Sequence, residues 1–363
     1  MTTQKTTRTN SPMNKAPVKL LERLCNAVGV SGAEDEIRNI VIEQVKNLVD
    51  EYKVDSLGNV LAVKHAKSKD ALRIMFAAHM DEVGFMLVED EEEGIFAFEP
   101  VGGIDPRQLL AKPVLVGKDH IEGVIGSKPI HLTSPEERSS AAAIKDLHID
   151  VSPGNAKAVK VGDYATYATR FQRNGSSLFG KAIDDRMGVA TLLELARVNP
   201  GKLEVLFAFT VQEELGLRGA RVAAYEFAPE MAFIIDSTPA FDLLLPDEET
   251  ENTQYNCRLG AGPAIYLADA GTISDPRLIR FLVREASENG IPYQFRQPGG
   301  GGTDAGAIHV NRSGVPSVSI SIPGRYAHSP VLHAKLQDWQ NTLDLLQIIL
   351  TKADRSILTV DRS

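Results

Sequence analysis

Histidine, aspartate and glutamate residues recur in this sequence next to the ends of apolar runs. His79 and Asp81 follow LRIMFAA (72–78), and an adjacent pair of glutamates follows LEVLFAFTVQ (203–212). The full set comprises His79, Asp81, Asp184, Asp185, Glu213, Glu214, Asp236 and His328. Two histidines with several carboxylates form a mixed nitrogen and oxygen donor set, which suits Zn²⁺, Co²⁺ or Mn²⁺. Two such ions can share a bridging carboxylate at a separation of about 3.5–4 Å. The residue types therefore favour a metal centre.

The adjacent glutamates Glu213 and Glu214 need a cationic partner if they lie near a dry core, because burying a carboxylate without compensation is costly. Divalent ions would provide that compensation. Neighbouring side chains in an extended segment point to opposite sides, so both glutamates are not expected to bind the same ion. We expect one of them to be a metal ligand and the other to act as a base toward metal-bound water.

These side chains become neighbours if the apolar runs are strands of one sheet. Residues 17–83 and 172–363 alternate helical periodicity with short apolar runs, which is typical of an α/β/α sandwich around a mostly parallel central sheet. The run LRIMFAAH (72–79) is continuously apolar up to its final histidine, as expected for a strand covered on both faces. Ligands of such sheets bind at the carboxyl ends of the strands. We therefore predict that the polar residues that follow these strands meet at that edge.

Residues 84–171 have a different pattern. Short β-like pieces are separated by glycine and proline, and helical periodicity nearly vanishes. This predicts a small β domain inserted into the catalytic α/β domain.

The N-terminal part of the chain begins with a polar segment, residues 1–16, which we predict to be a disordered leader. It lacks the apolar stretch of a secretory signal. A helix is predicted over VKLLERLCNAV (18–28). Ser31 and Glu34 then have the S-x-x-E spacing of a capping box, which predicts the start of a second helix.

Composition restricts the class of protein further. The chain has 363 residues and a formal net charge of −9, without a dense lysine and arginine cluster, which argues against a nucleic-acid partner. Its two cysteines, Cys25 and Cys257, are far apart, which excludes a disulfide framework and fits a reducing compartment. No apolar stretch approaches the roughly 20 residues of a membrane span. We expect a cytoplasmic protein without a membrane partner.

Five short motifs, in a fixed order along the chain, resemble the M42 family of metallo-aminopeptidases. They are AHMDEVGF (78–85), KAIDDRMG (181–188), TVQEELGLRGA (210–220), FIIDST (233–238) and RYAHSP (325–330), and GGGGTDAGAIH (299–309) belongs to the same pattern. The resemblance covers about residues 17–355. It implies a zinc-exopeptidase-like fold with an inserted β-barrel. It also implies a homo-oligomer, the tetrahedral dodecamer, for whose assembly the insert is used.

The resemblance also implies a role for each residue of the site. One divalent ion would be held by His79, Asp184 and Asp236, and a second by Asp184, Glu214 and His328. Glu213 would be the general base toward a water that bridges the two metals, and Asp81 would steady His79. The ions would be Zn²⁺ or Co²⁺, with Mn²⁺ as a further candidate. The implied reaction is hydrolysis of N-terminal residues from short peptides.

Three other functions compete with this one. A metal-dependent deacylase of N-acylated amino acids or peptides would prefer blocked substrates, which an aminopeptidase should reject. A glycosidase needs two carboxylates roughly 5–9.5 Å apart and no metal, which would leave the two histidines without a role. A non-catalytic scaffold is expected to have lost at least one ligand, and none is missing from the motifs.

Overall fold

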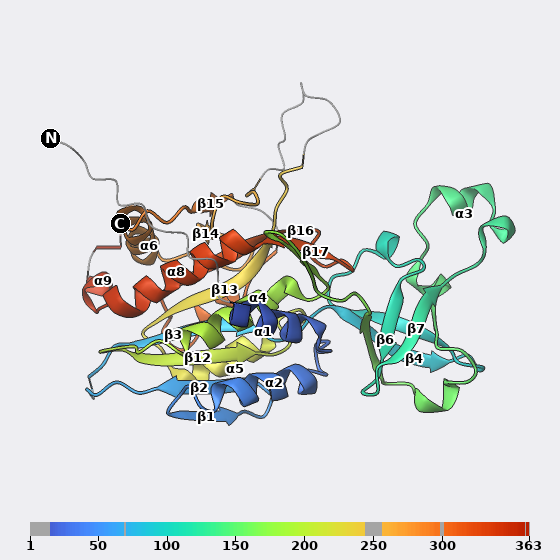
Figure 1. Cartoon of the computed structure of the whole chain (residues 1–363), viewed down its shortest axis with the longest axis horizontal. Coiled ribbons are helices and arrows are strands. Elements are labelled where there is room, and N and C mark those ends of the chain that lie inside the picture. Colours follow the sequence, from blue (N-terminus) through green and yellow to red (C-terminus); the bar gives the residue numbers. More distant parts are fainter. Residues whose placement is uncertain (1–14, 69, 244–255, 298–300, 360, 363) are drawn as a thin grey trace, which may run out of the picture.

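Two parts lie side by side in the computed structural model, a larger α/β unit and a smaller barrel (Figure 1). The structure describes residues 15–68, 70–243, 256–297, 301–359 and 361–362. Residues 1–14 of the predicted leader lie outside the described residues, whereas Lys15 already begins the first helix. Gly299 and Gly300 of the glycine run also lie outside them.

The larger unit is built on an 11-stranded sheet in the order β1-β2-β12-β3-β13-β16-β17-β11-β10, with β14 paired to β15 and β16. Its strands are β1 (Glu51–Val54), β2 (Val60–Lys64), β3 (Arg73–His79), β10 (Gln172–Asn174), β11 (Ser177–Gly180), β12 (Glu204–Thr210), β13 (Met231–Pro239), β14 (Ala264–Tyr266), β15 (Gln294–Arg296), β16 (Ser317–Arg325) and β17 (Leu332–Lys335). The four central strands β12, β3, β13 and β16 are parallel, and antiparallel strands flank them on both sides. The predicted α/β class is confirmed, with parallel pairing concentrated at the centre of a mixed sheet.

Helices cover both faces of this sheet and form two hydrophobic cores. One core contains residues of α1, α2, α4, α6 and α8, and the other contains residues of α5 and α7. The helices of the unit are α1 (Lys15–Asn26), α2 (Asp35–Val45), α4 (Ile183–Leu195), α5 (Arg218–Phe227), α6 (Pro276–Glu288), α7 (Ala305–Ile308), α8 (Leu336–Lys352) and α9 (Ser356–Thr359). Phe76 stacks on Phe207 and Phe233 across the three adjacent central strands. This packing on both faces explains why the central strands are almost wholly apolar.

The smaller part is a closed barrel with the strand order β4-β5-β8-β7-β6-β9. Its strands are β4 (Gly84–Asp90), β5 (Ile95–Val101), β6 (Pro113–Val116), β7 (Ile121–Gly126), β8 (His148–Asp150) and β9 (Tyr164–Tyr167). The short helix α3 (Pro135–Ser139) and the 3₁₀ turns 106–108, 130–132, 144–146 and 156–158 lie in its connections. Phe85 contacts Phe98 and Tyr167 edge to face inside the barrel, which has a core of its own. The inserted β-barrel predicted with the fold class is therefore present.

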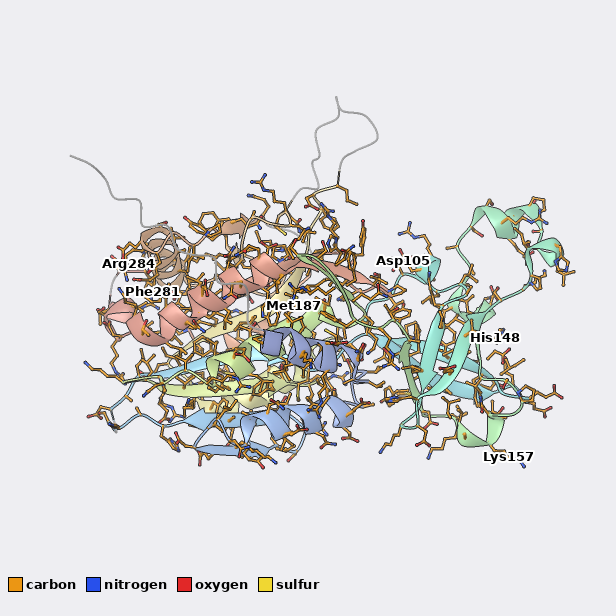
Figure 2. All side chains as sticks on the ribbon, viewed as in Figure 1. Asp105, His148, Lys157, Met187, Phe281 and Arg284 are labelled. Carbon is orange, nitrogen blue, oxygen red and sulfur yellow. The ribbon has the colours of Figure 1, made fainter. Side chains whose placement is uncertain are left out.

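Side chains fill the interior of both parts (Figure 2). Met187 of α4 is fully buried in the larger unit, whereas Asp105, His148 and Lys157 lie on the barrel. Within the described part of the chain, no helix has the length and apolar character needed to cross a membrane.

The predicted capping box at Ser31 and Glu34 is wrong. Helix α2 begins at Asp35, Glu34 occupies the N-cap position, and its side chain makes no capping bond. The segment first turns at Gly32, whose φ of +92° lies in the left-handed region, so Ser31 is too far upstream to cap the helix. Its hydroxyl donates instead to the buried carboxylate of Asp81.

Candidate metal centre

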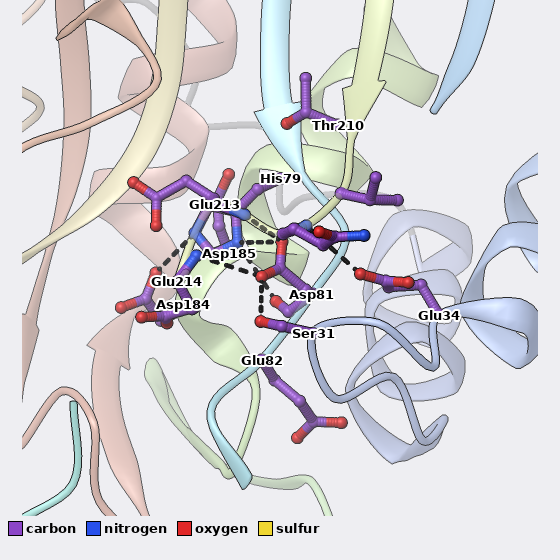
Figure 3. Close-up of polar contacts among 12 residues, drawn as sticks. Ser31, Glu34, His79, Asp81, Glu82, Asp184, Asp185, Thr210, Glu213 and Glu214 are labelled. Atoms are coloured by element: carbon purple, nitrogen blue, oxygen red, sulfur yellow. Dashed lines mark hydrogen bonds and ion pairs between the residues drawn. The ribbon is translucent and has the colours of Figure 1, made fainter. Parts of the chain in front are cut away.

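The polar residues singled out in the sequence lie at one edge of the sheet. His79 is the last residue of β3, Glu213 and Glu214 follow β12, and Asp236 is in the second half of β13. Asp184 stands at the start of α4, and His328 follows β16. Figure 3 shows His79, Asp184, Glu213 and Glu214 gathered beyond the strand ends. The parallel central strands therefore bring together side chains that are far apart in the sequence, as strand ends in such sheets do.

Three overlapping groups of these residues have ligand atoms within 4.8 Å of one another: His79 with Asp184 and Asp236, Asp184 with Glu214 and His328, and His79 with Glu213 and Glu214. Asp184 belongs to the first two groups. Its Oδ1 lies 3.3 Å from His79 Nε2, and its Oδ2 lies 3.7 Å from His328 Nε2. The Asp184 carboxylate therefore faces both histidines, with Oδ1 toward His79 and Oδ2 toward His328.

Both imidazoles are oriented by contacts to their Nδ1 atoms. His328 Nδ1 lies 2.9 Å from the carbonyl oxygen of Gly103, which comes from the segment that follows β5 of the barrel. His79 Nδ1 lies 3.2 Å from the carbonyl oxygen of Asp81. A proton on Nδ1 satisfies these carbonyls and leaves Nε2 free as an electron-pair donor. Each ring therefore turns Nε2 toward the carboxylates, the arrangement that metal-binding histidines adopt.

Asp81 lies behind this cluster and is fully buried. Its Oδ1 is 3.4 Å from His79 Nδ1 and accepts a hydrogen bond of 3.0 Å from the peptide N–H of Glu213. Its Oδ2 accepts one of 3.1 Å from the peptide N–H of Glu214. The carboxylate thus contacts the histidine and also the backbone that carries both glutamates.

The cluster is strongly anionic, and its proton affinities reflect this. Burial and neighbouring carboxylates raise the pKa of Glu214 to about 8 and that of Asp236 to about 6. The pKa of Glu213 is also raised well above its usual range by burial and by Asp236, Asp304 and Glu214. Burial alone would lower the pKa of His79, but the surrounding aspartates raise it well above its usual value. Accumulated negative charge in a dry site explains these shifts.

The residues present fit divalent cations. Among the described residues, no lysine or arginine forms an ion pair with the carboxylates of the three groups. The buried Asp184 Oδ1 accepts no hydrogen bond of acceptable geometry, although His79 Nε2 is nearby. Buried charges and polar atoms of this kind are normally paired or coordinate a metal. The nitrogen and carboxylate donor set is one that Zn²⁺, Co²⁺ and Mn²⁺ accept.

A cavity of about 550 Å³ opens directly onto the cluster. Besides the residues of the three groups, its walls include Gly103, Leu217, Tyr266, Arg296 and Gly301. The Arg296 guanidinium lies over the Tyr266 ring, with 4.7 Å between the guanidinium carbon and the ring centroid. The cavity has the volume of a small-molecule pocket. A small molecule or the end of an extended chain can therefore reach the polar cluster.

Two buried aspartates near the site, Asp304 and Asp185, received no individual role from the sequence. Asp304 accepts a hydrogen bond of 2.5 Å from Thr210, and burial together with nearby carboxylates raises its pKa to about 7. Asp185, which follows Asp184 through a cis peptide bond, is fully buried and accepts a hydrogen bond from the Gly188 N–H. The signal that could have indicated them is their position beside apolar residues inside the quoted motifs.

A buried charge cluster joins the site to the barrel. Glu82 accepts two hydrogen bonds of 2.6 Å from Lys181 Nζ and lies 3.3 Å from the Arg186 guanidinium. It also accepts a hydrogen bond from Thr166 of β9. All four side chains are nearly inaccessible to water. Since charges so deeply buried require their partners, this cluster ties the barrel firmly to the start of α4.

Comparison with known proteins, by sequence and by structure, finds aminopeptidases. The model of the family described as M42 glutamyl aminopeptidase matches residues 58–345. The chain is 36% identical over 332 residues to a putative aminopeptidase of Acetivibrio thermocellus, covering 90% of this chain and 96% of the relative. The structure is similar to that of an aminopeptidase from Desulfurococcus kamchatkensis, with a TM-score of 0.88, 35% identity and coverage of 95% and 97% of the two chains.

A further solved structure is the TET1 peptidase of Pyrococcus horikoshii, described as able to assemble into a tetrahedron or a large octahedral shell. It has a TM-score of 0.81 and 34% identity, with coverage of 93% of this chain and 100% of the other.

Proposed function

The chain belongs to the M42 family of aminopeptidases, and from this premise we propose that it removes N-terminal residues from short peptides with two divalent metal ions per subunit. The observation that carries the proposal is the pair of ligand groups that share Asp184. His79, Asp184 and Asp236 would hold one ion. Asp184, Glu214 and His328 would hold the other. Zn²⁺ and Co²⁺ are the first candidates, followed by Mn²⁺, because all three accept this donor set.

Bound at these two groups, divalent cations would polarise the scissile carbonyl and acidify the attacking water. Glu213 is then free to act as the base, because it is absent from both groups of the proposed pair. Burial and neighbouring carboxylates raise its pKa, which increases its affinity for a proton. A carboxylate oxygen of Glu213 would take the proton from water and pass it to the nitrogen of the leaving amine.

The carboxylates also favour a free α-amino group on the substrate. An ammonium group donates charge-assisted hydrogen bonds to carboxylates, whereas an acylated terminus has lost both the charge and two donors. The cavity that opens onto the cluster gives such a terminus access. This is the physical basis for preferring an aminopeptidase to a deacylase.

The first test compares matched peptides with free and N-acetylated termini. The metal-depleted protein is expected to be inactive, and added Zn²⁺ or Co²⁺ should restore cleavage of the free peptides only. Release of amino acids is followed by chromatography. Metal-dependent activity confined to the acetylated set would replace the proposal by a deacylase, and activity that persists after complete metal removal would contradict the metal mechanism.

We also propose that residues 84–171 form an assembly domain and that the protein forms a homo-oligomer, with the tetrahedral dodecamer as its expected form. The assembly of the Pyrococcus horikoshii relative supports this. So does the apolar surface of the barrel connection that contains α3, where Ile130 is 74% exposed and Leu132 is 58% exposed. Apolar side chains gathered at the surface commonly mark protein contacts.

Changing both Ile130 and Leu132 to aspartate is expected to shift the protein to lower oligomers, because unpaired charges are costly to bury in an apolar contact. Light scattering measures the mass. Val310, which is 63% exposed in the α/β unit, provides the matched control Val310→Asp. A double variant that remains the same size as the wild-type protein would remove this connection from the interface.

A further inference from the structure

Ser31 lies on the segment between α1 and α2, and its side chain is almost completely buried. Its Oγ is 2.5 Å from Asp81 Oδ2, close enough for a strong hydrogen bond donated to the carboxylate. Figure 3 shows this contact directly behind the metal-binding cluster. The segment is also joined to the strand end that carries His79, because Glu82 and Ser31 bond through their backbones. Ser31 therefore contacts Asp81 and the strand end behind the polar cluster, without belonging to any of the three ligand groups.

Asp81 is the point at which this contact could influence the reaction. Its carboxylate accepts from Ser31 and from the peptide N–H groups of Glu213 and Glu214, and it faces His79. Within the described part of the chain, no other carboxylate accepts hydrogen bonds from both of these peptide groups. A rotation of the Asp81 side chain would break its bonds to both peptide groups and its contact with His79 together. The position of the carboxylate is consequently linked to the metal-facing histidine and to the backbone of the base and of a ligand.

A carboxylate from the segment that carries Ser31, that of Glu34, also binds the backbone before the adjacent glutamates. Glu34 Oε1 accepts hydrogen bonds from the Gly32 N–H at 2.8 Å and the Gln212 N–H at 3.3 Å. Three consecutive peptide N–H groups, 212 to 214, thus point at carboxylates. Gln212 has a φ of +54°, a left-handed conformation that non-glycine residues rarely adopt. Successive N–H groups that converge in this way form an anion-binding concavity. The carboxylates of Glu34 and Asp81 occupy it, and Ser31 binds the second of them.

We propose that Ser31 is a positioning residue for the hydrolysis. Its hydroxyl holds Asp81 in the rotamer that orients His79 and fixes the backbone of Glu213 and Glu214. The inference rests on the proposed function for its consequence in catalysis, but the contacts themselves also predict an effect on metal binding. Residues that orient metal ligands typically change metal affinity or activity by about 10–100-fold when they are replaced.

The variant Ser31→Ala removes the hydroxyl and adds no atoms in its place. We expect kcat to fall by about 10–100-fold with KM nearly unchanged, and Co²⁺ binding, titrated by its visible absorption, to weaken over the same range. Ser31→Thr keeps a hydroxyl and should retain most of the activity. The matched control is Ser317→Ala, because Ser317 is similarly buried and its hydroxyl donates to the Val315 carbonyl instead of to a carboxylate.

The outcomes separate positioning from simple stabilisation. If Ser31→Ala has the same kcat and Co²⁺ affinity as Ser317→Ala, the proposal is wrong. It is also wrong if the activity loss disappears once only folded protein, measured by thermal unfolding, is counted. Equal losses in Ser31→Ala and Ser31→Thr would contradict a role for the hydroxyl. Should the wild-type protein cleave no free peptide, the proposed function fails, while the Co²⁺ titration still decides the role of Ser31.

Discussion

Replacing Glu213 by glutamine is expected to lower kcat by about 10²–10⁴-fold, the usual contribution of a general base. Glutamine has nearly the same shape but cannot accept a proton from water. The backbone at this position is held through its N–H by Asp81, so the substitution leaves the fold intact. Stopped assays at saturating peptide measure kcat.

Metal analysis of the same variant distinguishes a base from a ligand. Glu213 lies in a group with His79 and Glu214, but in neither of the two groups that share Asp184. The variant should therefore retain both ions. Glu226→Gln is the matched control, because Glu226 is half exposed, forms an ion pair with Lys53 and belongs to none of the three groups. Normal turnover in Glu213→Gln would remove this residue from the mechanism, and loss of one ion would make it a ligand.

Replacing Asp184 by asparagine should abolish binding of both ions, because one carboxylate faces His79 through Oδ1 and His328 through Oδ2. Asparagine offers a single neutral oxygen in its place. Loss of the ions removes several kcal/mol of transition-state stabilisation, equivalent to a fall in kcat/KM of about 10²–10⁴-fold. The metal content per subunit is measured by elemental analysis.

Asp236→Asn provides the comparison, because Asp236 is proposed to hold one ion only. Asp236 belongs to the group of His79 and Asp184, but not to the group that contains His328. We expect Asp236→Asn to retain one ion and Asp184→Asn none. Identical metal contents in the two variants would argue against a shared ligand.

The sequence was sufficient to predict the α/β class and the set of side chains that meet at the sheet edge. The reason is local. Each apolar run predicts a strand from its own residues, and the strand end then determines where the next polar residue lies. His79 after LRIMFAA is of this kind. Asp236 follows the apolar run MAFII, but β13 continues to Pro239, so this side chain projects from within the strand. Parallel pairing of β12, β3 and β13 then brings their ends to one edge without further information.

The contacts that depend on topology could not be predicted in this way. Ser31 and Asp81 are 50 positions apart, and Gly103 and His328 are 225 positions apart. Local spacing even favoured a different role for Ser31, because S-x-x-E before a helical pattern is the usual sign of a capping box. The buried pair of Glu82 and Lys181 joins two motifs whose residues, taken singly, would be expected at the surface.

The strand order also dictates when the site can form during synthesis. The barrel consists of one contiguous segment, from β4 to β9, so it can close as soon as that segment leaves the ribosome. The large sheet cannot, because β13 pairs with β16, which emerges much later. His328 follows β16, so it emerges after every other residue of the two proposed ligand groups. A nascent chain can therefore hold a finished barrel while the proposed set of metal ligands is still incomplete, and the two-ion site can be completed only after β16 and His328 have been made.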